Sequence, residues 1–106
     1  MIHYKHIFGA AERFWNKVHR SDKERCWPWR GCQKPSGYGR FHIGDHRVAA
    51  HRIAYVLTYG GIPDGYQIDH KCGFKDCCNP HHLEAVSPEE NRRRRHLKYK
   101  QGEYAQ

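Results

Sequence analysis

Residues 69–91 read DHKCGFKDCCNPHHLEAVSPEEN, a stretch that holds three of the five cysteines of the chain. Cys72 and Cys77 are separated by four residues, and His82 follows five residues after Cys77. A compact loop of this kind can bring two thiolates and an imidazole around one Zn²⁺ ion, which prefers tetrahedral ligation by sulfur and nitrogen. The spacing therefore predicts a structural zinc site that organises the fold.

A closed zinc site needs a fourth protein ligand. We expect an upstream cysteine to complete a Cys₃His set, with Cys26 as our choice and Cys32 as the alternative. Cys78 and His81 stand directly beside predicted ligands and are alternatives to them. Because the fourth ligand comes from upstream, the zinc would tie the N-terminal half of the chain to the C-terminal half.

Short elements are predicted on both sides of this loop. Residues 67–70 and 83–86 have the composition of two short antiparallel strands. After them, Ser87 is a typical N-cap, Pro88 suits the first helical position, and Glu90 stands three residues after the cap. The C-terminal half is therefore predicted to form a strand, a metal loop, a second strand and a helix that begins at the proline.

Three further elements are predicted upstream. Residues 9–18 place apolar side chains at helical spacing and predict a short amphipathic helix. Residues 26–31, CWPWRG, alternate as an edge or irregular strand does. Residues 51–59 predict a core helix, which a pair of glycines ends.

Residues 38–50 predict a β-hairpin with a Gly-Asp turn. A period of two places Phe41 and Ile43 on one face of its first strand, and Arg40 and His42 on the other. One face would then pack and the other would be cationic. A two-stranded ribbon with such a face fits the major groove of DNA, and a solvated polar face is the alternative.

The composition limits both the core and the partner. The chain of 106 residues has room for one domain, and Leu, Ile, Val and Phe make up only 17 of its residues, so a large aliphatic core is excluded. Fourteen aromatic residues and a metal site can instead build a small aromatic core. Nineteen Lys and Arg against eleven Asp and Glu give a net charge of +8 at pH 7, which favours a polyanionic partner.

The sequence has no run of the roughly 18 apolar residues that a membrane span needs, and residues 1–10 lack the apolar run of a secretion signal. We therefore expect a cytoplasmic protein with no membrane partner. In a reducing compartment, the cysteines are more readily explained as metal ligands than as disulfides.

Candidates for catalysis surround the predicted zinc, because a closed zinc site has no open coordination position. His70 ends the strand before the metal loop, and a neutral imidazole can deprotonate water near pH 7. Asp69 adjoins this histidine, and Asn91 lies in the first turns of the following helix. The oxygen atoms of these two side chains can hold one Mg²⁺-like ion on a phosphate.

The motif HxCxxxxCxNPxHL begins at His70 and ends at Leu83. Matching pieces lie upstream: RFWNKV at 13–18, CWPW at 26–29, GYGRF at 37–41 and HRIAYVLTYGGIPDG at 51–65. Over nearly its whole length to Arg92, the sequence resembles the zinc-containing HNH endonucleases of phages and their relatives, the His-Cys box homing endonucleases.

The resemblance implies an α+β fold of the small ββα-metal (His-Me finger) type, with an N-terminal helix and a β-hairpin, stapled by structural zinc. It implies His70 as the general base and Asn91 as a ligand of the catalytic cation. Asp69 matches a second cation ligand of some HNH enzymes. Asn79 would brace the zinc loop and, through it, the general base.

The resemblance also implies a DNA contact from the hairpin, and the basic run at 92–95 on the last helix is expected to contact phosphates on either side of the cut, with a solvated basic tail as the alternative. An arginine of the hairpin contacts the scissile phosphate in the relatives, and Arg47 is the best match, with Arg40 and Arg52 as alternatives. The residues expected to bind DNA are Arg40, His42, Arg47, Arg52, Arg92 and Arg93.

We therefore expect a metal-dependent endonuclease that hydrolyses double-stranded DNA, with one structural Zn²⁺ and one Mg²⁺ or similar catalytic ion. It would act in the cytoplasm of a bacterial host, encoded by a phage or mobile element, and a homodimer would be needed to cut both strands. The single domain at 1–106 would comprise a helix region at 1–20, a ββα-metal core at 67–98 and a flexible tail at 99–106. The main alternative is a zinc-stabilised DNA-binding module without catalysis, and a zinc knuckle for RNA or protein ranks last.

Overall fold

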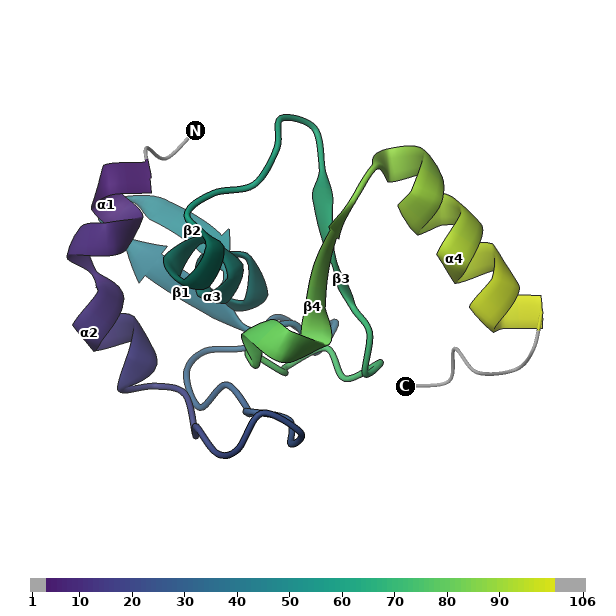
Figure 1. The fold of residues 1–106 in the computed structure, drawn as a ribbon. Helices are drawn as coiled ribbons and strands as arrows, with labels where there is room; N and C mark the ends of the chain where they lie inside the picture. Colours follow the sequence, from purple (N-terminus) through teal and green to yellow (C-terminus); the bar gives the residue numbers. More distant parts are fainter. Residues whose placement is uncertain (1–3, 101–106) are drawn as a thin grey trace.

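Figure 1 shows the computed structural model of the chain, which describes residues 4–100 and the side chains of residues 4–95. The elements in chain order are α1 (Tyr4–Gly9), α2 (Ala11–Trp15), β1 (Arg40–Ile43), β2 (His46–Ala49), α3 (Ala50–Tyr59), β3 (Gln67–His70), the 3₁₀ helix η1 (Pro80–His82), β4 (Leu83–Val86) and α4 (Pro88–Lys100). The strands form two separate antiparallel sheets, β1–β2 and β3–β4. This arrangement confirms the predicted α+β class. The expected tail at 99–106 lies mostly outside the described residues. Among the described residues, no helix is long and apolar enough to cross a bilayer.

The strands β3 and β4 enclose the metal loop, and α4 follows them, as the sequence predicts. The pairing ends with His70 opposite Leu83, so the loop begins where the sheet stops. The Oγ atom of Ser87 accepts a hydrogen bond of 3.1 Å from the backbone N–H of Glu90, which satisfies one of the free donors at the start of α4. Figure 1 shows α4 alongside the β3–β4 pair, on the side away from α1 and α2.

The hairpin β1–β2 and the helix α3 also agree with the prediction. The hairpin turn contains Gly44, whose φ of 57° suits glycine. Phe41 is 2% exposed whereas His42 is exposed, so β1 has a packing face and a cationic face. β2 runs directly into α3, which ends where the N–H of Gly60 donates to the carbonyl of Val56 at 2.8 Å.

The N-terminal region forms two short helices instead of the single helix predicted over residues 9–18. Ala10 separates α1 from α2, because its φ of −104° and ψ of 12° lie outside the helical range. The break allows Ile7 of α1 and Phe14 of α2 both to enter the core, where they are 3% and 0% exposed. Hydrophobic spacing within one segment did not reveal this break.

Residues 26–31, predicted as an edge or irregular strand, form two isolated bridges and no regular strand. Pro28 pairs with Cys77, and Trp29 pairs with Val18. Because proline has no N–H group to donate, a regular ladder cannot extend through it. The bridges nevertheless place this segment beside the metal loop.

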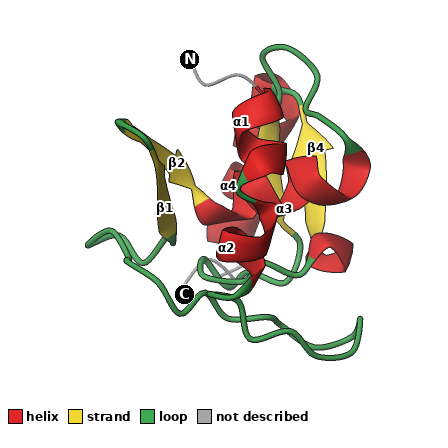
Figure 2. Ribbon diagram, turned by 90° about the vertical axis from the view of Figure 1, so that its left-hand side faces the viewer, coloured by secondary structure: helices red, strands yellow, loops and turns green. Residues whose placement is uncertain are grey.

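Aromatic rings form the centre of the core, as the composition predicts. The ring of Phe14 lies 5.1 Å from that of Trp29 and 5.3 Å from that of Phe41, measured between centroids. Gly39 packs on the indole, since a Cβ atom at this position would lie 2.6 Å from the Trp29 ring. Figure 2 shows α3 between the two sheets, and it contacts both β2 and β3. The core thus joins the hairpin to the unit that carries the metal loop.

Candidate functional site

The four residues predicted to bind zinc converge at one point. The Sγ atoms of Cys26, Cys72 and Cys77 and a ring nitrogen of His82 all lie within 4.8 Å of one another. The Nδ1 atom of His82 is 3.6 Å from the Sγ atoms of both Cys26 and Cys77. Tetrahedral ligation, with Zn–S of about 2.3 Å and Zn–N of about 2.0 Å, would separate sulfur from nitrogen by about 3.6 Å. The donor set and its spacing therefore fit Zn²⁺.

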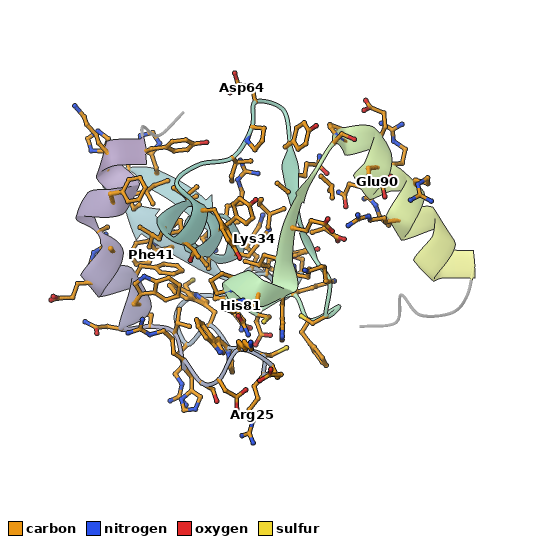
Figure 3. All side chains as sticks on the ribbon, in the orientation of Figure 1. Arg25, Lys34, Phe41, Asp64, His81 and Glu90 are labelled. Atoms are coloured by element: carbon orange, nitrogen blue, oxygen red, sulfur yellow. The ribbon has the colours of Figure 1, made fainter. Side chains whose placement is uncertain are left out.

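Backbone hydrogen bonds bring Cys26 to the metal loop. The N–H of Cys78 donates to the carbonyl of Trp27 at 2.8 Å, and the N–H of Trp29 donates to the carbonyl of Asp76 at 2.9 Å. These two bonds align the segment that follows Cys26 with the end of the loop. In Figure 3 the sulfur atoms gather where the two segments meet.

The other candidate zinc ligands lie outside the cluster. Cys32 is exposed, and His81, although next to a cluster member, is exposed as well. Cys78 is 1% exposed, and its burial raises the pKa of its thiol to about 12, which disfavours the thiolate that a metal requires. The structure thus places Cys26, and not Cys32, beside Cys72, Cys77 and His82.

The thiols of the cluster change one another's pKa values. A hydrogen bond with the Cys77 thiol lowers the pKa of Cys72 to about 5, and the same interaction raises the pKa of Cys77. Burial raises the pKa of Cys26. A lowered thiol pKa favours the thiolate form that a metal ligand requires, so Cys72 is suited to the role of zinc ligand.

Asn79 joins the metal loop to the segment that leads to Cys26. Its side chain is completely buried, and its Nδ2 atom donates to the carbonyls of Lys23 at 2.9 Å and Arg25 at 2.6 Å. Its Oδ1 atom accepts from the N–H of His81 at 2.9 Å. One amide thus fixes both η1 and the backbone just before Cys26.

His70 lies at the end of β3 and is 7% exposed. Its Nε2 atom lies 3.0 Å from the carbonyl oxygen of Cys77. Because a carbonyl can only accept, Nε2 carries the hydrogen and the neutral ring keeps its lone pair on Nδ1. Burial lowers the pKa of this histidine, which favours the neutral form. The metal loop therefore fixes the tautomer in which Nδ1 can accept a proton.

His51, to which the sequence analysis gave no role, packs on His70. The two ring centroids are 4.5 Å apart, and the ring of Tyr38 lies 5.6 Å from that of His51. The Nδ1 atom of His51 is buried and has no hydrogen-bond partner among the described residues. Burial, followed by the neighbouring His70, lowers the pKa of His51 to about 3. A histidine in the first turn of the predicted core helix is the signal in the sequence that could have indicated it.

Of the two candidate ligands of the catalytic cation, Asn91 lies on α4 and Asp69 faces α4 from β3. Alternation along β3 places Asp69 on the opposite face from His70, and its Oδ2 atom lies 3.3 Å from Nη1 of Arg94. Asn91 donates from Nδ2 to the side-chain oxygen of Gln67, at the start of β3. In the described part of the chain no hydrogen bond joins Asn91 to His70. The structure thus brings Asp69 close to the Asn91-bearing helix.

The basic residues of the hairpin lie at its turn. Arg47 and His42 are cross-strand partners, and both are exposed. An open hollow there is lined by His42, Gly44, Asp45, His46 and Arg47. Arg47 lies in β2, whereas the ring that packs on His70 belongs to His51 in the first turn of α3.

The remaining predicted DNA contacts differ in exposure. Arg40 and Arg52 are half-buried, and the Nε atom of Arg40 is buried without a hydrogen-bond partner among the described residues. Arg92 and Arg93 are exposed on α4, where Arg93 forms hydrogen bonds of 3.0 and 2.8 Å with Glu90. The exposed residues among the predicted DNA contacts therefore belong to two surfaces, one at the hairpin turn and one on α4.

Two short strands, a loop between them that carries Cys72, Cys77 and His82, and a following helix define the class of ββα proteins, here with a Cys₃His cluster that fits zinc. The model of the family described as HNH endonuclease matches residues 48–93. This segment extends from the end of β2 into α4 and includes His70 and Asn91. Residues 48–93 are therefore similar to the HNH endonuclease family, as the sequence motifs predict.

Several phage proteins are similar to the chain. Protein 7.7 of Escherichia phage T7 is 37% identical over 68 residues, which cover 64% of this chain and 52% of that protein. The uncharacterized gene 5.3 protein of Enterobacteria phage T3 is 41% identical over 56 residues, 47% of this chain and 55% of that protein. Protein 2.8 of phage T7 is 34% identical over 68 residues, 62% of this chain and 45% of that protein. The chain thus spans about half the length of these relatives, and no solved structure matches it.

Proposed function

We propose that this protein is a metal-dependent endonuclease that hydrolyses DNA phosphodiester bonds, with His70 as general base and a single Mg²⁺-type cation on Asn91. The observation that carries the proposal is the hydrogen bond between His70 Nε2 and the Cys77 carbonyl, within the segment that is similar to the HNH endonuclease family. This bond leaves Nδ1 as the proton acceptor, which is the chemistry that hydrolysis by water requires.

In this proposal His70 accepts a proton at Nδ1 from a water molecule, and that water attacks the phosphorus in line with the leaving 3′ oxygen. The Oδ1 atom of Asn91 is an oxygen donor of the kind that Mg²⁺ prefers. Asp69, whose Oδ2 atom pairs with Arg94, would add a carboxylate oxygen as the second ligand. When bound there, the cation would offset negative charge on the phosphate as the bond breaks. Burial lowers the pKa of His70, which keeps the ring neutral and able to accept this proton.

We further propose one structural Zn²⁺ per chain, held by Cys26, Cys72, Cys77 and His82. Its role would be to hold the metal loop in the conformation that aims the Cys77 carbonyl at His70. Asn79 supports the same loop, because its side chain is hydrogen-bonded both to η1 and to the segment that leads to Cys26. In this account zinc acts on catalysis only through the position of the general base.

Double-stranded DNA is the proposed substrate, because the net charge of +8 favours a polyanion. Arg47 and His42 would contact its backbone from the hairpin, and Arg92 and Arg93 from α4, with Arg40 and Arg52 nearer to the site. Cutting of both strands would need two copies acting as a dimer. The phage relatives support a site of action in the cytoplasm of an infected bacterium. We also propose that residues 1–106 act as one domain, with the helix region at 1–20 and the ββα-metal core at 67–98.

A zinc-stabilised DNA-binding module without catalysis is the second candidate function. Its supporting observations are the 7% exposure of His70 and the hydrogen bond that engages Asn91 with Gln67. Supercoiled plasmid incubated with Mg²⁺, with and without EDTA, separates the two functions. An endonuclease converts the plasmid to open-circular or linear DNA only when Mg²⁺ is available. A pure binder retards the plasmid in a gel but leaves it supercoiled, and that result would refute the endonuclease.

A further inference from the structure

The part of helix α4 whose side chains the structure describes, residues 88–95, has no apolar face to dock it. None of these side chains is buried, and all but the first are charged or polar. A helix on the surface of a protein ordinarily docks through an apolar stripe. Asn91 itself is hydrogen-bonded to Gln67 of β3. Further polar contacts hold the described part of α4, and with it this proposed cation ligand, against the sheet.

Arg94 supplies those contacts. Its guanidinium lies 2.6 Å from a carboxylate oxygen of Glu84, 3.3 Å from one of Asp69 and 2.7 Å from one of Glu90. Asp69 and Glu84 are cross-strand partners on β3 and β4, so their side chains share the face of the sheet that α4 covers. Figure 3 shows charged side chains filling the space between α4, with its labelled Glu90, and the β3–β4 pair.

This network differs from an ordinary surface ion pair. The Arg94 side chain is 28% exposed and that of Asp69 is 15% exposed, so solvent screens their attraction less than it does at an open surface. A single guanidinium that joins several carboxylates loses its side-chain freedom once for all of these contacts. By contrast, Arg93 is exposed and its ion pair is with Glu90 of its own helix. Arg94 thus links α4 to the sheet, whereas the Arg93 ion pair stays within the helix.

We propose that Arg94 is a positioning residue, which holds α4 and therefore Asn91 against β3–β4 through Glu84 and Asp69. The docking of α4 by this network is independent of the reaction, but its effect on catalysis rests on the proposed endonuclease function. Within the basic run at 92–95, Arg94 therefore contacts the sheet, whereas the other three arginines are exposed.

The test compares Arg94→Gln, Glu84→Gln and the double variant with the parent protein, and uses Glu89→Gln as the matched control. Glu89 is an exposed carboxylate on α4 outside the network. The Glu84 side chain is 44% exposed, so its replacement keeps the fold, which retained zinc content would verify. Two readouts are needed: kcat and KM for plasmid nicking, and hydrogen exchange of the α4 amides.

We expect each single variant to lower kcat by about tenfold or more, since a misplacement of about 1 Å at a catalytic group can cost about 100-fold. KM for DNA should stay close to the parent value in Glu84→Gln, because that change removes no positive charge. The double variant should be no worse than the poorer single variant, as expected for two members of one interaction. Exchange of the α4 amides should accelerate in the same three variants and not in Glu89→Gln.

A Glu84→Gln protein with parental kcat and parental exchange in α4 would overturn the proposal. So would Arg94→Gln that raises KM alone, because this result would make Arg94 a phosphate contact. If the parent protein does not cut DNA, the endonuclease proposal fails, and the exchange data still decide whether the network docks α4.

Discussion

The Nε2 atom of His70 lies 3.0 Å from the carbonyl oxygen of Cys77, so the proposed general base is bonded to the backbone of a proposed zinc ligand. The state of the metal loop and the orientation of the imidazole are therefore linked. A change that loosens the metal loop should therefore weaken this hydrogen bond and alter the orientation of the His70 ring.

Zinc removal should abolish cleavage even when Mg²⁺ is present, because the loop that aims the Cys77 carbonyl would lose its cross-link. Protein purified without added metal should contain about one zinc per chain by elemental analysis. After treatment with a zinc chelator and dialysis, Mg²⁺ alone should not restore nicking, whereas Zn²⁺ with Mg²⁺ should. Full recovery with Mg²⁺ alone would show that the loop needs no zinc.

Cys26→Ser should lower zinc content well below that of the parent, since Cys26 belongs to the cluster and serine is a poor zinc ligand. Cys32→Ser is the matched control, because Cys32 is exposed and lies outside the cluster. We expect the control to retain its zinc. The opposite result, with zinc lost only from Cys32→Ser, would assign the fourth ligand to Cys32.

Asn79→Ala should reduce the free energy of unfolding by about 2 kcal/mol or more, because it removes three hydrogen bonds of a completely buried amide. Urea unfolding at a fixed zinc concentration measures the effect. His81→Ala is the control, since the His81 side chain is exposed and only its backbone N–H bonds to Asn79. A loss within about 0.5 kcal/mol for Asn79→Ala, as for an ordinary surface change, would contradict the bracing role.

Acid should destabilise the protein through His51. Its pKa is about 3 in the folded chain and near 6.5 in an unfolded one, so the unfolded chain binds the extra proton between these values. Stability is therefore complete above pH 6.5 and falls as the pH drops towards 3, by about 2 kcal/mol at pH 5 for this group.

Thermal or urea unfolding at pH 7 and pH 5 measures this loss. His51→Phe, which keeps a ring beside His70, should lose less stability between the two pH values than the parent does. His46→Phe, a change at an exposed histidine, should behave as the parent does. Equal losses in the parent and His51→Phe would mean that His51 is not held neutral.

Local patterns in the sequence predicted most of the fold. The strands around the metal loop, the serine cap of α4 and the hairpin all depend on neighbours within a few residues, which is the range that periodicity and capping signals cover. The N-terminal helix was predicted wrongly, because the break at Ala10 serves the burial of Ile7 and Phe14 in a core built by distant elements.

The candidate site was predictable only in part. Ligand spacing and the resemblance to HNH enzymes indicated the cysteines that the structure brings together. The contacts of His51 with His70 and of Arg94 with Glu84 join elements that only tertiary packing brings together. No spacing rule reaches across such distances, so these contacts became visible only in the structure.

The nicking rate of His70→Ala beside that of the parent tests the central claim most directly. General-base catalysis is typically worth about 10²–10⁴-fold, so the variant should cut at least about 100-fold more slowly. Its zinc content and its affinity for DNA should match those of the parent, because the substitution leaves the cluster and the exposed cations in place. A folded, zinc-loaded His70→Ala protein that nicks plasmid at the parental rate would contradict the account.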